Sequence, residues 1–168
     1  MVLVGMMASG KTTVGRRLAA RLGRPFLDSD RQIESRTGRT VREIFEADGE
    51  AAFRRLESEV LAQALSWTEP AVIAAAGGAV LDPANRRRLR QAGTVVWLRA
   101  DPAVLAARAR SGRHRPLLAH DRVGVLARLD RERRELYGEV ADHVVDVGGR
   151  RPDAVVDAVV DAVVETPR

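Results

Sequence analysis

The sequence predicts a single α/β domain, residues 1–168, built on a five-stranded parallel sheet flanked by helices. Short apolar runs alternate with amphipathic stretches from one end of the chain to the other, as expected for strands joined by helices. The apolar runs are short and nearly continuous, which suits strands that are buried on both faces. The chain has no internal repeat or low-complexity linker that would mark a domain boundary.

The five predicted strands are the apolar runs at Val2–Val4, Phe26–Asp28, 71–75, 94–98 and His143–Asp146. Several of the stretches between them carry helix-start signals. Asp82-Pro83 and Asp101-Pro102 each place an acidic N-cap before a proline at the first helical position. We therefore expect helices at Lys11–Leu22, 30–37, 41–48, 49–66, Pro83–Gln91, 102–110, 123–137 and 152–164.

A phosphate-binding signature lies between the first predicted strand and the first predicted helix. Residues 5–12 read Gly-Met-Met-Ala-Ser-Gly-Lys-Thr and fit the P-loop pattern G-x-x-x-x-G-K-[ST]. Lys11 is the only lysine among 28 basic residues. Its thin stem can place a point charge between phosphate oxygens where a guanidinium would not fit. Because a strand precedes this loop and a helix follows it, the sequence predicts binding of a nucleoside triphosphate.

Composition narrows the choice of location and partner. The chain has no cysteine, which excludes disulfides and thiolate catalysis, and its three scattered histidines make a poor metal site. The N-terminal apolar run is too short for a signal peptide and no run reaches transmembrane length, so we expect a cytoplasmic protein without a membrane partner. Acidic residues are interleaved with the basic ones and aromatic residues are few, so the net charge of +5 suits anionic small substrates better than nucleic acid.

Candidate catalytic groups follow the predicted strands. Asp28-Ser29-Asp30 comes directly after the second strand, at the sheet edge beside the P-loop. One carboxylate can hold Mg²⁺ through water while the other orients or deprotonates a hydroxyl; the alternative is that Asp30 only caps a helix. Residues 111–116 are polar and cationic, as expected for a mobile flap, and Arg113 and Arg115 are either phosphate-binding fingers or ordinary surface arginines.

Two further stretches have simpler interpretations. Gly77 and Gly78 follow the third strand and indicate either a tight turn or a place where the backbone closely approaches a ligand. The run Arg86-Arg87-Arg88 is interpreted as a solvated helix face, without a functional role.

Together these motifs resemble the shikimate kinase family over nearly the full chain. Residues 5–18 resemble its P-loop and first helix, Asp28-Ser29-Asp30 its Asp-x-Asp, and residues 48–57 its D-G-E…F-R-x-x-E stretch. The remaining matches are to its glycine loop, its lid sequence R-P-L-L and its R-x-x-L-Y motif, at residues 77–80, 115–118 and 133–137. The resemblance implies a P-loop NTPase fold of the nucleoside-monophosphate-kinase-like type, with substrate-binding helices at about 30–66 and a mobile lid at about 108–122.

The resemblance also implies a role for each matched residue. ATP would be held by the P-loop and by residues near the adenine, namely Ala8, Ser9, Gly10, Lys11, Thr12, Thr13, Arg108, Arg150 and Pro152. Mg²⁺ would be held by Thr12 and, through water, by Asp28. Asp30 would orient and activate the substrate hydroxyl, and Arg115 would close on the γ-phosphate, so that the catalytic residues are Lys11, Asp30 and Arg115. Arg54 and Arg133 would clamp the substrate carboxylate, helped by the backbone at Gly77 and Gly78.

The implied activity is ATP-dependent phosphorylation of the 3-hydroxyl of shikimate, a step of aromatic amino-acid biosynthesis, by a monomeric enzyme. The chain departs from the family pattern at Ala8 and Ala76, where glycines are usual, and at Ala74, where a small hydroxyl or acidic residue is frequent. A Cβ at position 8 is costly if φ is positive there. The acceptor alternatives are a related cyclitol, hydroxy acid or sugar acid.

Other functional classes have less support. The non-kinase alternative is a P-loop ATPase or a nucleotide-binding regulator, which would not need Asp30 or the lid arginines. A nucleoside monophosphate kinase shares the fold, but we find no monophosphate-binding pattern. A gluconate-type kinase has no evident need for two carboxylate-binding arginines. A GTP-binding switch needs the motif N/T-K-x-D, which this chain excludes because it has no second lysine.

Overall fold

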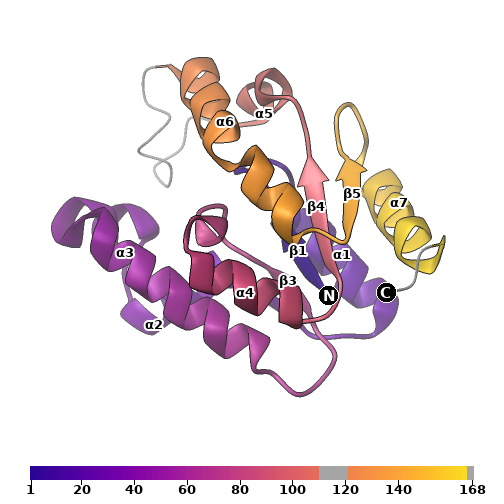
Figure 1. Ribbon diagram of the computed structural model, residues 1–168, viewed down its shortest axis with the longest axis horizontal. Helices are drawn as coiled ribbons and strands as arrows, with labels where there is room; N and C mark the ends of the chain where they lie inside the picture. The colour runs from indigo at the N-terminus through magenta and orange to yellow at the C-terminus, as the bar shows by residue number, and fades with distance from the viewer. Residues whose placement is uncertain (110–120, 166–168) are drawn as a thin grey trace.

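The computed structural model describes residues 1–109 and 121–165, and its centre is a five-stranded parallel sheet (Figure 1). The strand order is β2-β3-β1-β4-β5, so the first strand lies in the middle. Leu3 on that strand pairs with Ala74 on one side and with Val96 on the other. The strands are β1 (Val2–Val4), β2 (Phe26–Asp28), β3 (Val72–Ala74), β4 (Val95–Arg99) and β5 (His143–Asp146). All five predicted strands are confirmed to within one residue at each end.

Helices cover both faces of the sheet. In Figure 1, α4 and α6 lie on one side of the sheet, while α1 and α7, which pack against each other, lie on the other side. The helices are α1 (Lys11–Leu22), α2 (Ser29–Thr37), α3 (Val41–Leu65), the short 3₁₀ helix η1 (Ala79–Leu81), α4 (Pro83–Gln91), α5 (Pro102–Arg108), α6 (Arg122–Val140) and α7 (Pro152–Glu165). Helix α6 runs three residues past its predicted end, and η1 was not predicted.

Local sequence chemistry explains where these helices start. The Asp82 carboxylate accepts a hydrogen bond from the Ala84 N–H at 2.7 Å, and Asp101 does the same for Ala103 at 2.8 Å. Both acidic N-caps predicted from the Asp-Pro pairs are therefore confirmed. Helix α3 starts with a capping box in which the side chains of Thr40 and Glu43 each bond the other's backbone N–H.

Helix α3 contains the break that the sequence predicted between two helices. Residues 41–65 comprise two helices that meet at a kink, where Gly49 has φ 80° and ψ 171°, far from helical values. Only glycine adopts such a conformation without steric strain. The kink separates a short arm, residues 41–48, from the longer segment that packs towards α4.

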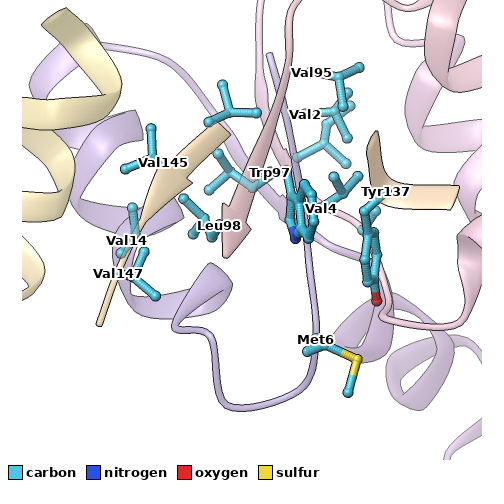
Figure 2. Close-up of a cluster of buried hydrophobic side chains, with 14 of the residues drawn as sticks. Val2, Val4, Met6, Val14, Val95, Trp97, Leu98, Tyr137, Val145 and Val147 are labelled. Atoms are coloured by element: carbon cyan, nitrogen blue, oxygen red, sulfur yellow. The ribbon is translucent and has the colours of Figure 1, made fainter. Parts of the chain in front are cut away.

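Two groups of buried apolar side chains hold the molecule together. The larger group contains the strand residues and the inner faces of α1, α4, α6 and α7, and part of it is drawn in Figure 2. A second and smaller group lies between α2 and α3, formed by Ile33, Ile44, Phe53 and Val60. Over residues 1–109 and 121–165, no helix is long and apolar enough to cross a membrane.

Candidate active site

The P-loop connects β1 to α1 at the carboxyl edge of the sheet, as predicted. Lys11 lies in the first turn of α1, and its Nζ donates hydrogen bonds to the carbonyl oxygens of Gly5 at 2.7 Å and Met6 at 2.9 Å. The ammonium therefore lies inside the curve of its own loop. The N-terminus of α1 faces the same space, so backbone N–H groups and the helix dipole favour an anion there.

Ala8 stands where the family usually has glycine, and it adopts the left-handed backbone conformation that favours glycine. Its φ is +64°, and it is the only non-glycine residue with positive φ in the part of the chain that the structure describes. An L-residue with a Cβ pays about 1 kcal/mol for this conformation. Next to it, the Ser9 hydroxyl is buried and has no hydrogen-bond partner within the described residues. The loop therefore stores strain and an unsatisfied polar group at the predicted phosphate site.

Thr12 and Asp28 meet beside the P-loop. The Thr12 hydroxyl donates to Asp28 Oδ2 at 2.7 Å, although the two residues lie on different elements. These hydroxyl and carboxylate oxygens are the hard ligands that Mg²⁺ prefers, so the residues present fit this ion. Asp28 pairs with Ala74 across the sheet, and the methyl group of Ala74 adds no further ligand. In the described ranges, no group of three or more His, Cys, Asp or Glu side chains forms a closed metal cage.

The structure corrects the alternative interpretation of Asp30. The N-cap of α2 is Asp28, whose Oδ1 accepts a hydrogen bond from the Arg31 N–H at 3.4 Å. Asp30 is the second residue of the helix. The Asp30 side chain is exposed at the carboxyl edge of the sheet. It is close enough to the buried Glu57 for its charge to affect that residue's pKa. Asp30 thus lies beside the predicted acceptor site without serving as the cap.

Arg54 lies against the glycine loop. A Cβ on Gly78 would be 1.8 Å from Arg54 Nη1, so any side chain at position 78 would displace the guanidinium from its place against the loop. Arg54 forms ion pairs with Glu57 and Glu50, each at 2.9 Å, and lies 5.5 Å from the centre of the Phe53 ring. A cavity of about 740 Å³ opens beside these groups.

Glu57 is a buried carboxylate for which the sequence predicted no role of its own. It is only 2% exposed. Burial raises the pKa of Glu57 above its ordinary value; the neighbouring Arg54 opposes this rise and Asp30 adds to it. Its ion pair with Arg54 fixes one end of the guanidinium. The sequence signal was the spacing of three between Arg54 and Glu57, which places both side chains on one helix face.

Arg133 reaches the same glycine loop from α6. It is 5% exposed, and its Nη1 donates to the Gly77 carbonyl oxygen at 3.3 Å. Its buried Nε has no hydrogen-bond partner within the described residues. A nearly buried guanidinium with a long bond and an unsatisfied donor is an unfavourable arrangement unless an anion completes it. Arg54 and Arg133 therefore converge on two consecutive glycines, and their role as a carboxylate clamp stays a prediction.

The residues predicted to border adenine lie together on the other side of the P-loop. Arg108 Nη2 donates to the Val147 carbonyl oxygen at 2.7 Å, and the Arg150 N–H bonds the same carbonyl at 3.4 Å. Pro152 begins α7 directly after this turn. Thr13 is exposed in the first turn of α1. The predicted lid residues Arg113 and Arg115 lie outside the described residues, and Arg122 bonds the Ala109 carbonyl at 3.2 Å across the two flanks of that segment.

The interpretation of Arg86 as a solvated residue is wrong. Its side chain is only 16% exposed, and Nη1 donates to the carbonyl oxygens of Val80 at 2.8 Å and Leu81 at 3.3 Å. It also pairs with Glu139 of α6 at 2.8 Å. The sequence of three arginines does not indicate which of them points inward, because the hydrogen-bond and ion-pair partners of Arg86 lie on η1 and α6. Arg86 thus supports the end of the glycine loop.

Known proteins are similar to this chain in sequence and in fold. The family model for shikimate kinase matches residues 7–164. A shikimate kinase from Symbiobacterium thermophilum is 54% identical over 143 residues, which cover 83% of this chain and 82% of the relative. One from Aromatoleum aromaticum is 50% identical over 157 residues, covering 92% of this chain and 89% of the relative.

Solved structures agree with this. The shikimate kinase from Acinetobacter baumannii in complex with shikimate has a TM-score of 0.93 at 38% identity, covering 98% of this chain and 92% of that one. A gluconokinase from Sinorhizobium meliloti has a TM-score of 0.66 at 21% identity, covering 98% and 90%, and shares the fold alone. The sequence match over nearly the whole chain and the superposition of the fold agree, and this chain belongs to the shikimate kinase family.

Proposed function

We propose that this chain transfers the γ-phosphoryl group of ATP to the 3-hydroxyl of shikimate, giving ADP and shikimate 3-phosphate. The observation that carries the proposal is the pair of arginines from different helices, Arg54 and Arg133, that meet at the Gly77-Gly78 loop. A planar guanidinium matches a carboxylate with two parallel hydrogen bonds. Shikimate carries one carboxylate on a hydroxylated ring, which fits two arginines beside an aspartate.

The donor half of the reaction uses the P-loop. The Lys11 ammonium and the N–H groups at the start of α1 would hold the ATP phosphates, together with residues 8–13. Thr12 and Asp28 would hold Mg²⁺, which when bound neutralises charge on the phosphate oxygens. Arg108, Arg150 and Pro152 would border the adenine, and Arg115 would approach the γ-phosphate.

Asp30 would act on the acceptor hydroxyl. In the transfer, the hydroxyl oxygen forms a bond to the γ-phosphorus while the bond from that phosphorus to the bridging oxygen of ADP breaks. The hydroxyl proton passes to the Asp30 carboxylate, which is exposed at this edge of the sheet. Arg54, which is partly exposed, and the buried Arg133 would hold the ring so that the hydroxyl lies in line with the phosphoryl group, which lowers the barrier by prior orientation.

The test is an ADP-release assay with ATP, Mg²⁺ and a panel of acceptors, namely shikimate, its analogue without the carboxylate, an uncharged cyclitol and a sugar acid. We expect turnover with shikimate and a large loss without the carboxylate. ADP release that is independent of any acceptor would indicate an ATPase, and preference for the uncharged cyclitol would contradict the clamp. Ala76→Gly is a control for the loop substitution, with at most a modest gain expected.

Asp30→Asn tests the role of the aspartate. We expect ATP and acceptor binding to be retained and kcat to fall about a hundredfold or more, because a general base is lost. If the loss is mainly in the acceptor KM, Asp30 is a binding group instead.

We further propose that the protein works as a cytoplasmic monomer. The residues assigned to the two halves of the site all belong to one chain, which supports this state. Analytical ultracentrifugation with and without ATP and shikimate tests it, and a dimer at working concentration would contradict it.

A further inference from the structure

Tyr137 is a fully buried tyrosine whose polar end lies at the acceptor loop. Its hydroxyl donates to the Gly77 carbonyl oxygen at 2.7 Å, and its ring stacks on Trp97 with 5.6 Å between ring centres. Figure 2 shows the two rings side by side, Trp97 from β4 and Tyr137 from α6. Burial strongly raises the pKa of the Tyr137 hydroxyl, so it stays protonated at physiological pH and acts here as a donor.

The Gly77 carbonyl oxygen is shared between two donors from the same helix. Arg133 and Tyr137 are four residues apart on α6, and both side chains reach this oxygen, at 3.3 Å and 2.7 Å. The tyrosine bond is the shorter of the two. A carbonyl oxygen can accept both bonds, but the longer one holds Arg133 only weakly at Gly77. The Arg133 guanidinium also hydrogen-bonds the Tyr137 hydroxyl and, with five N–H donors, keeps some of them for another partner.

The direction of this carbonyl also sets the direction of the next N–H group. In a trans peptide the C=O of one residue and the N–H of the next point in opposite directions, and the described residues contain no cis peptide bond. A Gly77 carbonyl held towards α6 therefore turns the Gly78 N–H away from α6. Gly78 is the residue that contacts the Arg54 guanidinium.

We propose that Tyr137 is a positioning residue for the acceptor carboxylate. Through one hydrogen bond it holds the Gly77-Gly78 peptide in orientation and leaves the donors of Arg133 available for the ligand. This role rests on the proposed function, because the carboxylate is that of the proposed acceptor. Without the hydroxyl, Arg133 remains as a donor to Gly77, and the guanidinium is drawn to the loop instead of the ligand.

Tyr137→Phe tests this role, because phenylalanine keeps the ring and its stack on Trp97 and removes only the hydroxyl. We expect the shikimate KM to rise about tenfold, as for one lost hydrogen bond, with the ATP KM and kcat changed less than about twofold. The shikimate Kd, measured by calorimetry without nucleotide, should rise by the same factor. An unchanged KM and Kd would overturn the proposal.

Val140→Ala is the matched control for a purely structural effect. Val140 is buried three residues further along α6, so this variant loses stability without touching Gly77. We expect its shikimate KM to stay within about twofold of the wild type. A tenfold rise in the control would show that any loosening of α6 has this effect and would overturn the specific role of the hydroxyl.

A double variant tests whether Tyr137 acts through Arg133. If it does, Tyr137→Phe in an Arg133→Lys background should raise the shikimate KM by much less than it does in the wild type. Equal fold-changes in both backgrounds would overturn the coupling. The wild-type assay keeps the two proposals apart. Inactivity on shikimate contradicts the proposed function, whereas activity with an unaffected Tyr137→Phe variant contradicts the positioning role alone.

Discussion

Replacing Arg133 with methionine should change stability and acceptor binding in opposite directions. Methionine keeps most of the unbranched side chain and removes the guanidinium. Arg133 is 5% exposed, and its Nη1 bonds the Gly77 carbonyl oxygen at 3.3 Å. Its Nε has no hydrogen-bond partner in the described structure. The Gly77 carbonyl keeps its bond from Tyr137. The substitution therefore removes a buried charge without leaving that acceptor unpaired.

Two magnitudes follow from this geometry. Removing a buried charge avoids its desolvation penalty, so replacing Arg133 with an apolar side chain is expected to raise the free energy of unfolding of the unliganded protein by about 1 kcal/mol, after the lost attraction between Arg133 and the buried Glu57 is subtracted. Loss of one arm of a buried carboxylate clamp should weaken shikimate binding by about 2–5 kcal/mol. In terms of KM this is an increase of about thirtyfold or more.

Thermal unfolding without ligand and steady-state kinetics with shikimate measure the two effects. A gain of about 1 kcal/mol corresponds to a Tm rise of about 2–4 °C in a chain of this size. The ATP KM should stay within about twofold of the wild type, since the backbone hydrogen bond of Arg133 goes to Gly77 of the acceptor loop. A variant with lower Tm and unchanged shikimate KM would refute the reasoning, because Arg133 would then be an ordinary structural arginine.

Three further predictions concern the P-loop and Glu57. Lys11→Arg should keep the far-UV circular dichroism spectrum and lose at least about tenfold in kcat, because a guanidinium is too large for the space in which Nζ lies 2.7 Å from Gly5 O. Near wild-type turnover would contradict this. Ala8→Gly should raise Tm by about 1–2 °C, because relief of the positive φ slightly exceeds the greater flexibility of glycine in the unfolded chain; a lower Tm would contradict it. Because burial raises the Glu57 pKa above 4.5, the folded protein binds more protons than the unfolded chain in the range just above that value. The wild type should therefore lose stability relative to Glu57→Gln as pH rises through this range, as measured by urea unfolding, and a constant difference would contradict the shift.

Features that depend on neighbouring residues along the chain were predicted well. The strands are short apolar runs, the Asp-Pro pairs start helices, and the break at Gly49 was placed correctly because these signals are local. The P-loop and the Asp28 side chain could also be placed, since parallel strands bring their carboxyl ends to one edge.

Features that depend on distant partners were not predicted. The inward turn of Arg86 follows from carbonyl groups on η1 and from Glu139 on α6. The Tyr137 hydroxyl bond likewise joins residues 60 positions apart, and the position of this tyrosine was known only through the family motif. The role of Arg115 stays a prediction, because it lies outside the described residues.

The smaller apolar group between α2 and α3 has a consequence for how this fold diversifies. Its four side chains come from α2 and from both parts of α3, and they are distinct from the residues of the core beneath the P-loop. Substitutions that reshape the acceptor side can therefore accumulate there while the nucleotide half keeps its packing. Because residues 41–48 contribute to this small group of side chains, we expect their amides to exchange with solvent earlier than those of the central strands.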